Sequence, residues 1–331
     1  MNKKTTIEDI AKICGVSKAT VSYVLNGKKS AMKMSKDTVK EIIEVCERLG
    51  YRPDKTAQAL SAMRKIPLNL IILTPWLYSQ YSDFMAQINS AFESISREKE
   101  IKFSYAYYER GSLSKHMKPE KYKKYDAVII AGTSVDDDAY LERNSAYFDN
   151  IIMLNRCVKG IYSVYGNDRE ATFDLASRVK AKGHYDSFVI VGENTDSFCR
   201  VERYAALKEA FPDAVISEFE GNIDSENAKK LFEEHKKGKT CFAFTLFSPA
   251  SLFLTHLLRQ GVKIPLDCGI ICFDIHTLLS DYLPLTLSTV DPKLSDMVQA
   301  AYGIALSLKE GAVPESKCIH AEIIEGETAK L

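Results

Sequence analysis

The sequence predicts a small all-α head followed by a larger α/β body that contains two doubly wound parallel sheets. Three observations lead to this fold class. The first 50 residues show three helical apolar patterns in succession. From Ile66 onward, short apolar runs alternate with helical patterns, as in parallel sheets that helices cover on both faces. The body of about 265 residues exceeds the usual size of one hydrophobic core, so we expect two subdomains.

The head begins with two short helices separated by a glycine turn. Thr6 is placed to cap the first helix, with Asp9 as its capping-box partner. Gly15 can adopt the positive φ of a tight turn, and Ser17 can cap a second helix over Lys18–Leu25. This pattern predicts a helix-turn-helix, a motif whose second helix enters the major groove of DNA.

A third helix and the distribution of charge complete the picture of the head. Ser35 can cap this helix and Gly50 can end it. Residues 1–65 carry 14 lysines and arginines against 7 aspartates and glutamates, whereas the remainder carries 30 against 37. The chain as a whole is neutral. A basic head on an acidic body is typical of a protein that meets nucleic acid at one end.

Eight apolar runs in the body are rich in β-branched and aromatic residues and predict strands. These strands are expected at Leu68–Leu73, Ile101–Tyr107, Ala127–Ala131, Ile151–Leu154, Phe188–Val191, Val215–Phe219, Cys241–Phe244 and Ile270–Phe273. The run Asp136-Asp137-Asp138 lacks the glycine and ligand spacing of a calcium loop. It predicts the first turn of a helix instead.

Composition and missing motifs exclude several classes of protein. No apolar run is long enough to cross a bilayer, and the N-terminus shows no signal-peptide core, so we expect a cytoplasmic protein without membrane contact. The eight cysteines are scattered and predict neither a disulfide framework nor a zinc site. There is no glycine-rich phosphate loop, nucleophile elbow or metal-spaced cluster, so we expect no enzyme, no cofactor and no metal.

The run from Thr6 to Asn26 resembles the N-terminal signature of the LacI family of bacterial transcription regulators. Its specific part is Gly15-Val16-Ser17, then Thr20-Val21-Ser22, then Leu25-Asn26. Weaker similarity continues through the body, for example at Asn150–Arg156 and Ile270–Asp274. The resemblance implies a sequence-specific DNA-binding regulator, most often a repressor, whose body has the type I periplasmic-binding-protein fold.

The resemblance also implies which residues contact DNA. Lys18, Ala19 and Tyr23 match positions that touch base edges, and Leu60 matches a leucine that wedges into the minor groove. Tyr23 replaces the usual arginine, so the operator should differ from those of other members. The full expected set is Thr6, Ser17, Lys18, Ala19, Thr20, Ser22, Tyr23, Asn26, Ala57 and Leu60.

The resemblance further sets the expected domain boundaries. The head should span 1–53, a hinge helix and linker 54–65, and an effector-sensing and dimerisation domain 66–331. One subdomain should comprise about 66–164 plus 292–319, and the other about 165–291 plus 320–331. Because no leucine heptad follows the last strand-like run, we expect a homodimer that reads a near-palindromic double-stranded operator.

In such bodies, ligands bind at the carboxyl ends of strands between the two sheets. Asn155, Arg203 and Asp274 match family positions that hydrogen-bond a small-molecule effector, and Trp76 can stack on a ring. Where sugar-responsive members carry an Asn-Asp pair, this chain has Leu246-Phe247. We therefore expect a sugar-like but atypical effector, with Phe247 in its site.

Other interpretations stay open. Arg203 also fits a structural ion pair, and Trp76 also fits simple packing. The apolar step Leu246-Phe247 leaves open a DNA-binding protein whose body has lost ligand control. A solute-binding protein with the same body fold is a further alternative, which the DNA-binding head opposes.

Overall fold

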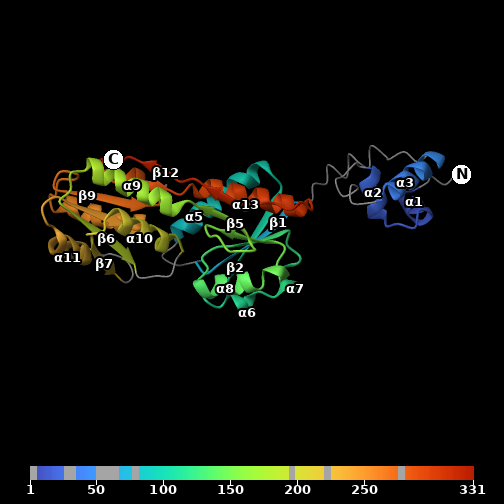
Figure 1. Ribbon diagram of the computed structural model, residues 1–331, viewed down its shortest axis with the longest axis horizontal. Helices are drawn as coiled ribbons and strands as arrows, with labels where there is room; N and C mark the ends of the chain where they lie inside the picture. The colour runs from blue at the N-terminus through green and yellow to red at the C-terminus, as the bar shows by residue number, and fades with distance from the viewer. Residues whose placement is uncertain are drawn as a thin grey trace. The chain divides into compact units, whose positions relative to one another are not determined.

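The computed structural model describes residues 6–25, 35–49, 67–76, 82–193, 198–219, 225–274 and 280–331 (Figure 1). The chain divides into two compact units, Met1–Ile66 and Pro67–Leu331. The predicted hinge helix lies outside the described residues, and so do Asn26, Ala57 and Leu60. None of the helices within the described ranges is both long and apolar enough to cross a membrane.

The head contains three helices, α1 (Ile7–Ile13), α2 (Lys18–Leu25) and α3 (Lys36–Arg48). The predicted caps are confirmed. Thr6 and Asp9 form a reciprocal capping box, the Ser17 hydroxyl accepts from the Thr20 amide at 3.1 Å, and the Ser35 hydroxyl caps α3. Gly15, with a φ of 63°, makes the turn between α1 and α2. The three helices pack together because each contributes a fully buried side chain, namely Ile10, Val21 and Ile42.

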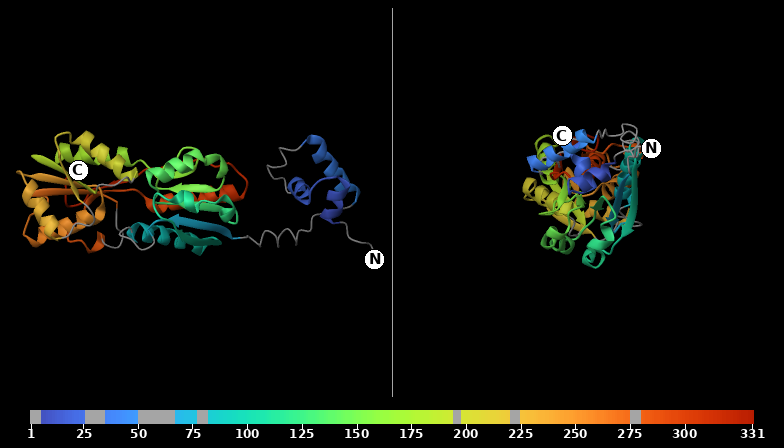
Figure 2. Two further views of the ribbon diagram at one scale, coloured as in Figure 1. Left: turned by 90° about the horizontal axis from the view of Figure 1, so that it is seen from below. Right: turned by 90° about the vertical axis from the view of Figure 1, so that its right-hand side faces the viewer.

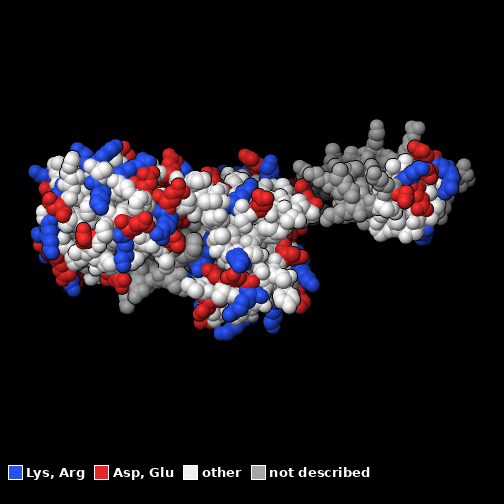
Figure 3. All heavy atoms as spheres, in the orientation of Figure 1, with Lys and Arg blue, Asp and Glu red and all other residues white. Residues whose placement is uncertain are grey.

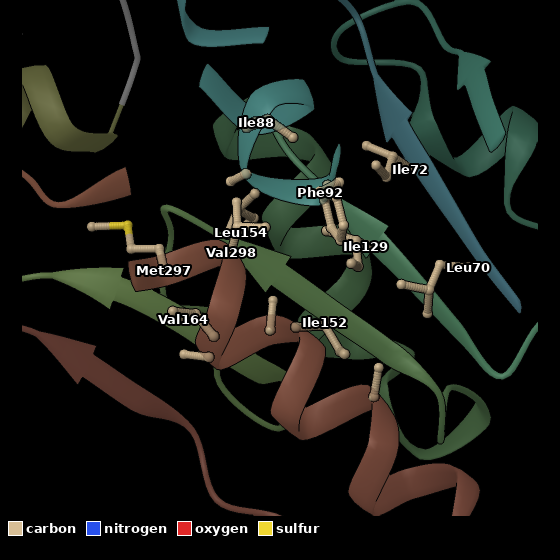
Figure 4. Close-up of a cluster of buried hydrophobic side chains, with 14 of the residues drawn as sticks. Leu70, Ile72, Ile88, Phe92, Ile129, Ile152, Leu154, Val164, Met297 and Val298 are labelled. Atoms are coloured by element: carbon tan, nitrogen blue, oxygen red, sulfur yellow. The ribbon is translucent and has the colours of Figure 1, made fainter. Parts of the chain in front are cut away.

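The first sheet of the body has the strand order β11-β5-β4-β3-β1-β2. Its strands are β1 (Leu68–Thr74), β2 (Ile101–Tyr107), β3 (Ala127–Ile130), β4 (Ile151–Leu154), β5 (Tyr162–Gly166) and β11 (Lys317–Ile319). Helices α5 (Ser82–Glu98) and α13 (Leu294–Lys309) cover one face, where Phe92 and Val298 meet Ile129 and Ile152 (Figure 4). On the other face lie α6 (Leu113–His116), α7 (Pro119–Tyr122) and α8 (Val135–Arg143).

The second sheet repeats this arrangement with the order β12-β10-β9-β8-β6-β7. Its strands are β6 (Ser187–Glu193), β7 (Val215–Phe219), β8 (Thr240–Phe244), β9 (Cys268–Phe273), β10 (Ser288–Asp291) and β12 (Glu322–Ile324). Helices α11 (Ser225–His235) and α12 (Phe247–Arg259) cover one face. Helices α9 (Asp168–Lys182) and α10 (Phe198–Ala210) cover the other. The two sheets form the two lobes of the body (Figure 2).

The predicted fold class is confirmed, with two refinements. Among the described residues of the body, the strand pairs are parallel except β10 with β12, which is antiparallel, so the second sheet is mixed at one edge. The described residues also contain four strands beyond the eight expected ones: β5, β10, β11 and β12. These four are short and partly polar, and they lie at the ends of the two sheets or next to them. Hydrophobic pattern alone therefore did not predict them.

The chain passes between the two sheets three times. After β5 it enters α9, which packs on the second sheet, and after β10 it enters α13, which packs on the first. The third passage joins β11 to β12. The side chain of Asn167, at the first passage, links to the third, since its Oδ1 accepts from the Ala321 amide at 2.8 Å.

Candidate effector site and DNA-binding head

A cavity of about 850 Å³, including its open mouth, lies where the carboxyl ends of strands from both sheets meet. The first sheet supplies residues that follow β1, β3 and β4, and the second supplies residues that follow β8, β9 and β10. The lining residues are Trp76, Phe84, Gln87, Gly132, Thr133, Leu154, Asn155, Arg156, Arg203, Leu246, Asp274, Pro292 and Leu294. This is the place where ligands bind in open α/β sheets.

Asn155 and Asp274 are presented to the cavity by the same backbone turn in the two sheets. Each directly follows a central strand, and each adopts a left-handed conformation, with φ of 59° and 73° respectively. The Asn155 amide donates to the Val164 carbonyl at 2.8 Å, and the Asp274 amide donates to the Val290 carbonyl at 3.0 Å. Asn and Asp tolerate this conformation better than other side chains, and such residues cluster at binding sites.

Arg203, on α10, is held between two carboxylates and is only 3% exposed. Its guanidinium donates to Asp168 at 2.7 Å and makes a bidentate pair with Asp274 at 3.0 and 2.8 Å. It also donates to the Thr245 carbonyl at 3.3 Å. Asp168 is buried, whereas the Asp274 side chain is 33% exposed and lines the cavity. One guanidinium is therefore shared by two carboxylates, one from the start of α9 and one that follows β9.

Arg156 makes a second buried ion pair at the cavity, within the first half of the body. Its Nε atom pairs with Asp138 of α8. The Thr133 hydroxyl donates to the other carboxylate oxygen of Asp138 at 2.6 Å. Burial raises the pKa of Asp138, while the hydrogen bond from Thr133 and the charge of Arg156 act in the opposite direction.

Trp76 is held in a defined position at the cavity wall. Its amide donates to the Thr74 hydroxyl at 3.2 Å, and its ring packs edge-to-face on Phe84 with centroids 5.5 Å apart. Gly132, at φ 79°, lies against the indole, because a Cβ at that position would come within 2.9 Å of the ring. A side chain at position 132 would therefore displace Trp76.

The structure brings four of the five expected effector residues into one cavity: Trp76, Asn155, Arg203 and Asp274. The fifth, Phe247, is buried in the core of the second sheet, and the neighbouring Leu246 lines the cavity instead. Sequence reasoning missed Phe84, Gln87, Thr133, Arg156 and Leu294. Thr133 and Arg156 follow the ends of β3 and β4, so the strand-end rule could have found them.

In the head, expected DNA-contacting residues already have intramolecular partners. The Lys18 ammonium lies 2.8 Å from the Glu8 carboxylate, with both side chains about half exposed. This hydrogen bond lowers the pKa of Glu8. The Ser17 and Thr20 hydroxyls lie 2.8 Å apart at the start of α2, and Thr6 caps α1. The side chains of Ala19, Ser22 and Tyr23 lie outside the described part of the chain.

Charge on the body gives no sign of a large basic surface on the face seen in Figure 3. There, lysines and arginines are mixed with aspartates and glutamates over the described residues. A mixed surface of this kind is usual for a protein region that does not bind nucleic acid through its own charge. The basic excess of the chain belongs to residues 1–65.

Comparison with known proteins identifies the head and the fold. Residues 6–54 match the family model described as bacterial regulatory proteins, lacI family. The chain is 24% identical over 321 residues to the catabolite repressor/activator of Salmonella typhimurium, covering 93% of this chain and 94% of that protein. It is 26% identical over 327 residues to the HTH-type transcriptional regulator AscG of Escherichia coli, covering 93% of each.

Among solved structures, the chain is similar to the lac repressor dimer bound to operator and the anti-inducer ONPF. The TM-score is 0.63 at 18% identity, and the match covers 98% of this chain and 99% of the other. A helix-turn-helix head on a two-sheet body with a cavity between the sheets defines a DNA-binding transcription regulator. The head of the chain thus matches the model of the lacI family of bacterial regulatory proteins, and transcription regulators at 24–26% identity align with nearly its whole length.

Proposed function

We propose that this regulator is a repressor, not an enzyme, and that a small molecule bound in the cavity controls its affinity for the operator. The observation that carries the proposal is the cavity itself. It is lined from both sheets, and the Asn155 and Asp274 turns present one polar side chain from each. A ligand that contacts both sheets favours one angle between them and so shifts the populations of the two arrangements.

The proposed contacts with DNA centre on α2. Lys18, Ala19 and Tyr23 would read base edges, and Lys18 must first leave Glu8, its partner in the structure. Thr6, Ser17, Thr20, Ser22 and Asn26 would fix the helix on the DNA backbone. We propose that two copies read a near-palindromic site, and that residues 54–65 form a hinge whose Ala57 and Leu60 enter the minor groove.

The proposal predicts both sequence preference and assembly. Selection from a randomised DNA library should yield a site with two-fold symmetry, and Tyr23→Ala should relax the preference at one or two positions in each half-site. Light scattering should give the mass of a dimer at micromolar concentration. Unchanged base preferences in Tyr23→Ala would remove Tyr23 from the residues that read the operator.

The second candidate is a DNA-binding protein whose body no longer responds to ligand, and Leu246 on the cavity wall favours it. Measuring operator affinity in the presence of compounds that bind the body distinguishes the two candidate functions. A regulator under ligand control should show at least a fivefold change in operator affinity, the low end of allosteric coupling. A compound that binds the cavity and leaves operator affinity unchanged would favour the second candidate.

A further inference from the structure

The polar residues that follow β4 and β9 and the apolar residues that follow β1 and β8 lie at different distances from the passages between the sheets. In the first sheet, Asn155 and Arg156 follow β4, near the passages between the sheets, whereas Trp76 follows β1, two strands farther away. In the second sheet, Asp274 follows β9, and Leu246 follows β8, one strand farther. A ligand that fills the cavity therefore meets Asn155 and Asp274 near the passages, and Trp76 and Leu246 farther from them.

The polar end offers acceptors but no uncompensated positive charge among the described lining residues. Arg156 is paired with Asp138, and Arg203 is shared by Asp168 and Asp274. Asp274, one-third exposed, is the charged carboxylate that faces the cavity. An anionic ligand would meet this negative charge or would have to break a buried ion pair. A hydroxyl or ammonium group can instead donate to Asp274.

The apolar end has a rigid aromatic component. The Trp76 ring is fixed by Phe84 on its edge and by the space that Gly132 leaves for it. Leu246 is the other apolar lining residue at this end, whereas Leu154, Pro292 and Leu294 lie at or next to the ends of β4 and β10, near the polar residues. A ligand hydroxyl that faces Leu246 would lose its hydrogen bonds to water without replacement. The cavity therefore disfavours a molecule that carries hydroxyl groups on every side.

We infer that the effector is an amphipathic molecule with two distinct parts. Its head is neutral or cationic and donates hydrogen bonds at Asp274 and Asn155. Its other part is an aromatic ring or a similar flat apolar group, which lies between Trp76 and Leu246. Anions and simple polyols are poor ligands of this cavity. The inference rests on the proposed function only in calling this ligand the effector.

The test uses Trp76, the single tryptophan of the chain, as a fluorescent reporter in the cavity. The probes are matched pairs: phenyl and methyl glycosides of the common hexoses and pentoses, and 2-phenylethylamine against 3-phenylpropionate. Calorimetry on the full-length protein gives the affinities. We expect the best phenyl glycoside to bind about tenfold more tightly than its methyl partner. The amine should bind about tenfold more tightly than the carboxylate.

A variant of the cavity wall gives an independent readout. Leu246→Asn should reduce the advantage of phenyl over methyl glycosides at least threefold, because the amide restores a polar partner. This variant should fold, since position 246 is the N-cap of α12 and asparagine is a favoured capping residue. Leu266→Asn is the control, at a residue 70% exposed and outside the cavity lining, and it should leave both affinities unchanged.

Three results would overturn the inference: methyl glycosides binding as tightly as phenyl glycosides, the carboxylate binding more tightly than the amine, or no probe binding at about 10 mM. An operator-binding measurement separates this failure from failure of the proposed function. If methyl glycosides or anions bind and change operator affinity, the proposed function stands and the inference falls. If probes bind in the expected order without any effect on operator affinity, the ligand class stands and the proposed function falls.

Discussion

The two halves of the body share one strand order, yet they bury their cavity arginines in different ways. In the first half, the carboxylate that pairs with Arg156 among the described residues is that of Asp138, and both residues belong to that half. In the second half, Arg203 has two carboxylate partners. One of them, Asp274, faces the cavity, and the other, Asp168, is the first residue of α9, directly after the passage from the first sheet.

The number and position of the carboxylate partners therefore distinguish the two arginines. The pair of Arg156 is local to the first half, whereas the group around Arg203 can transmit a movement from the cavity to the passage between the sheets. The Asp168 carboxylate lies against Gly166, where a Cβ would come within 2.9 Å of Asp168 Oδ2. A ligand that moves Asp274 thus acts through one shared guanidinium on a residue packed against the passage between the sheets. The pair of Arg156 with Asp138 joins two residues of the same half, which follow β4 and lie on α8. We therefore expect the second half to couple the cavity to the angle between the sheets.

The largest expected effect follows from removing each arginine. Arg203→Met leaves two carboxylates without their shared cation and should lower the free energy of unfolding by about 3–5 kcal/mol. Arg156→Met should cost less, because Asp138 keeps the hydrogen bond from Thr133 and can take up a proton as its pKa is already raised. Urea unfolding of the two variants gives the comparison. An equal or larger loss in Arg156→Met would contradict the distinction between the two ion pairs.

A smaller loss of stability should follow from changing Asn155 or Asp274. Both residues have a left-handed backbone conformation, but their side chains have different roles. Glycine accepts a positive φ without strain, so replacing either residue with glycine tests the side chain alone. Asp274→Gly should cost about 2–3 kcal/mol, because it breaks the bidentate pair with Arg203. Asn155→Gly should change stability by less than about 1 kcal/mol.

Thermal unfolding gives the stability of Asp274→Gly and Asn155→Gly, and titration with the probes gives their ligand affinities. Both variants should bind the phenyl glycosides more weakly, since each loses a polar group at the same end of the cavity. Only Asp274→Gly should also change the coupling between ligand and operator. Equal loss of coupling in Asn155→Gly would show that the two halves contribute alike.

The ion pair of the first half should also show a pH dependence. Burial raises the pKa of Asp138 above its usual value. A carboxyl group with a raised folded-state pKa contributes stability below its unfolded pKa, and that contribution is lost as pH rises through the folded pKa. The stability of the wild type relative to Asp138→Asn should therefore decline from acidic toward neutral pH. Carboxyl titration by NMR checks the direction, and a depressed Asp138 pKa would contradict it.

Sequence reasoning reached the fold because its signals are local. Capping residues such as Thr6, Ser17 and Ser35 and continuous apolar strands are visible in short windows. It also placed Asn155, Arg203 and Asp274 at one site, through the family resemblance. It did not show that Arg203 is shared by Asp168 and Asp274, because these residues are 35 and 71 positions away and meet only in the folded protein. Nor did it separate Leu246 from Phe247, since which of two neighbours faces a cavity depends on where α12 begins.

The smallest expected effect concerns how one helix begins in each half. In the first half, α8 starts with a complete capping box formed by Ser134 and Asp137. In the second half, α12 starts at Phe247, and its N-cap is Leu246, which has an extended backbone with φ −141° and ψ 153° and makes no side-chain cap. A good cap contributes about 1 kcal/mol. Leu246 thus makes the cavity wall apolar but leaves α12 without a side-chain cap and so less stable. Such a loss of stability is common where a residue serves a binding site.

Two substitutions should therefore move stability in opposite directions. Leu246→Asn should raise the free energy of unfolding by about 0.5–1 kcal/mol, since its amide can accept from an amide of the first turn. Ser134→Ala should lower the free energy of unfolding by about 1 kcal/mol. The buried Asp137 carboxylate also accepts from the Gly111 and Leu113 amides, so the loss is somewhat larger if Asp137 shifts when the capping box is lost. Urea titration of both variants at one pH resolves effects of this size. If Leu246→Asn were destabilising by more than about 1 kcal/mol, Leu246 would be a packing residue of the second half and not a wall kept apolar for a ligand.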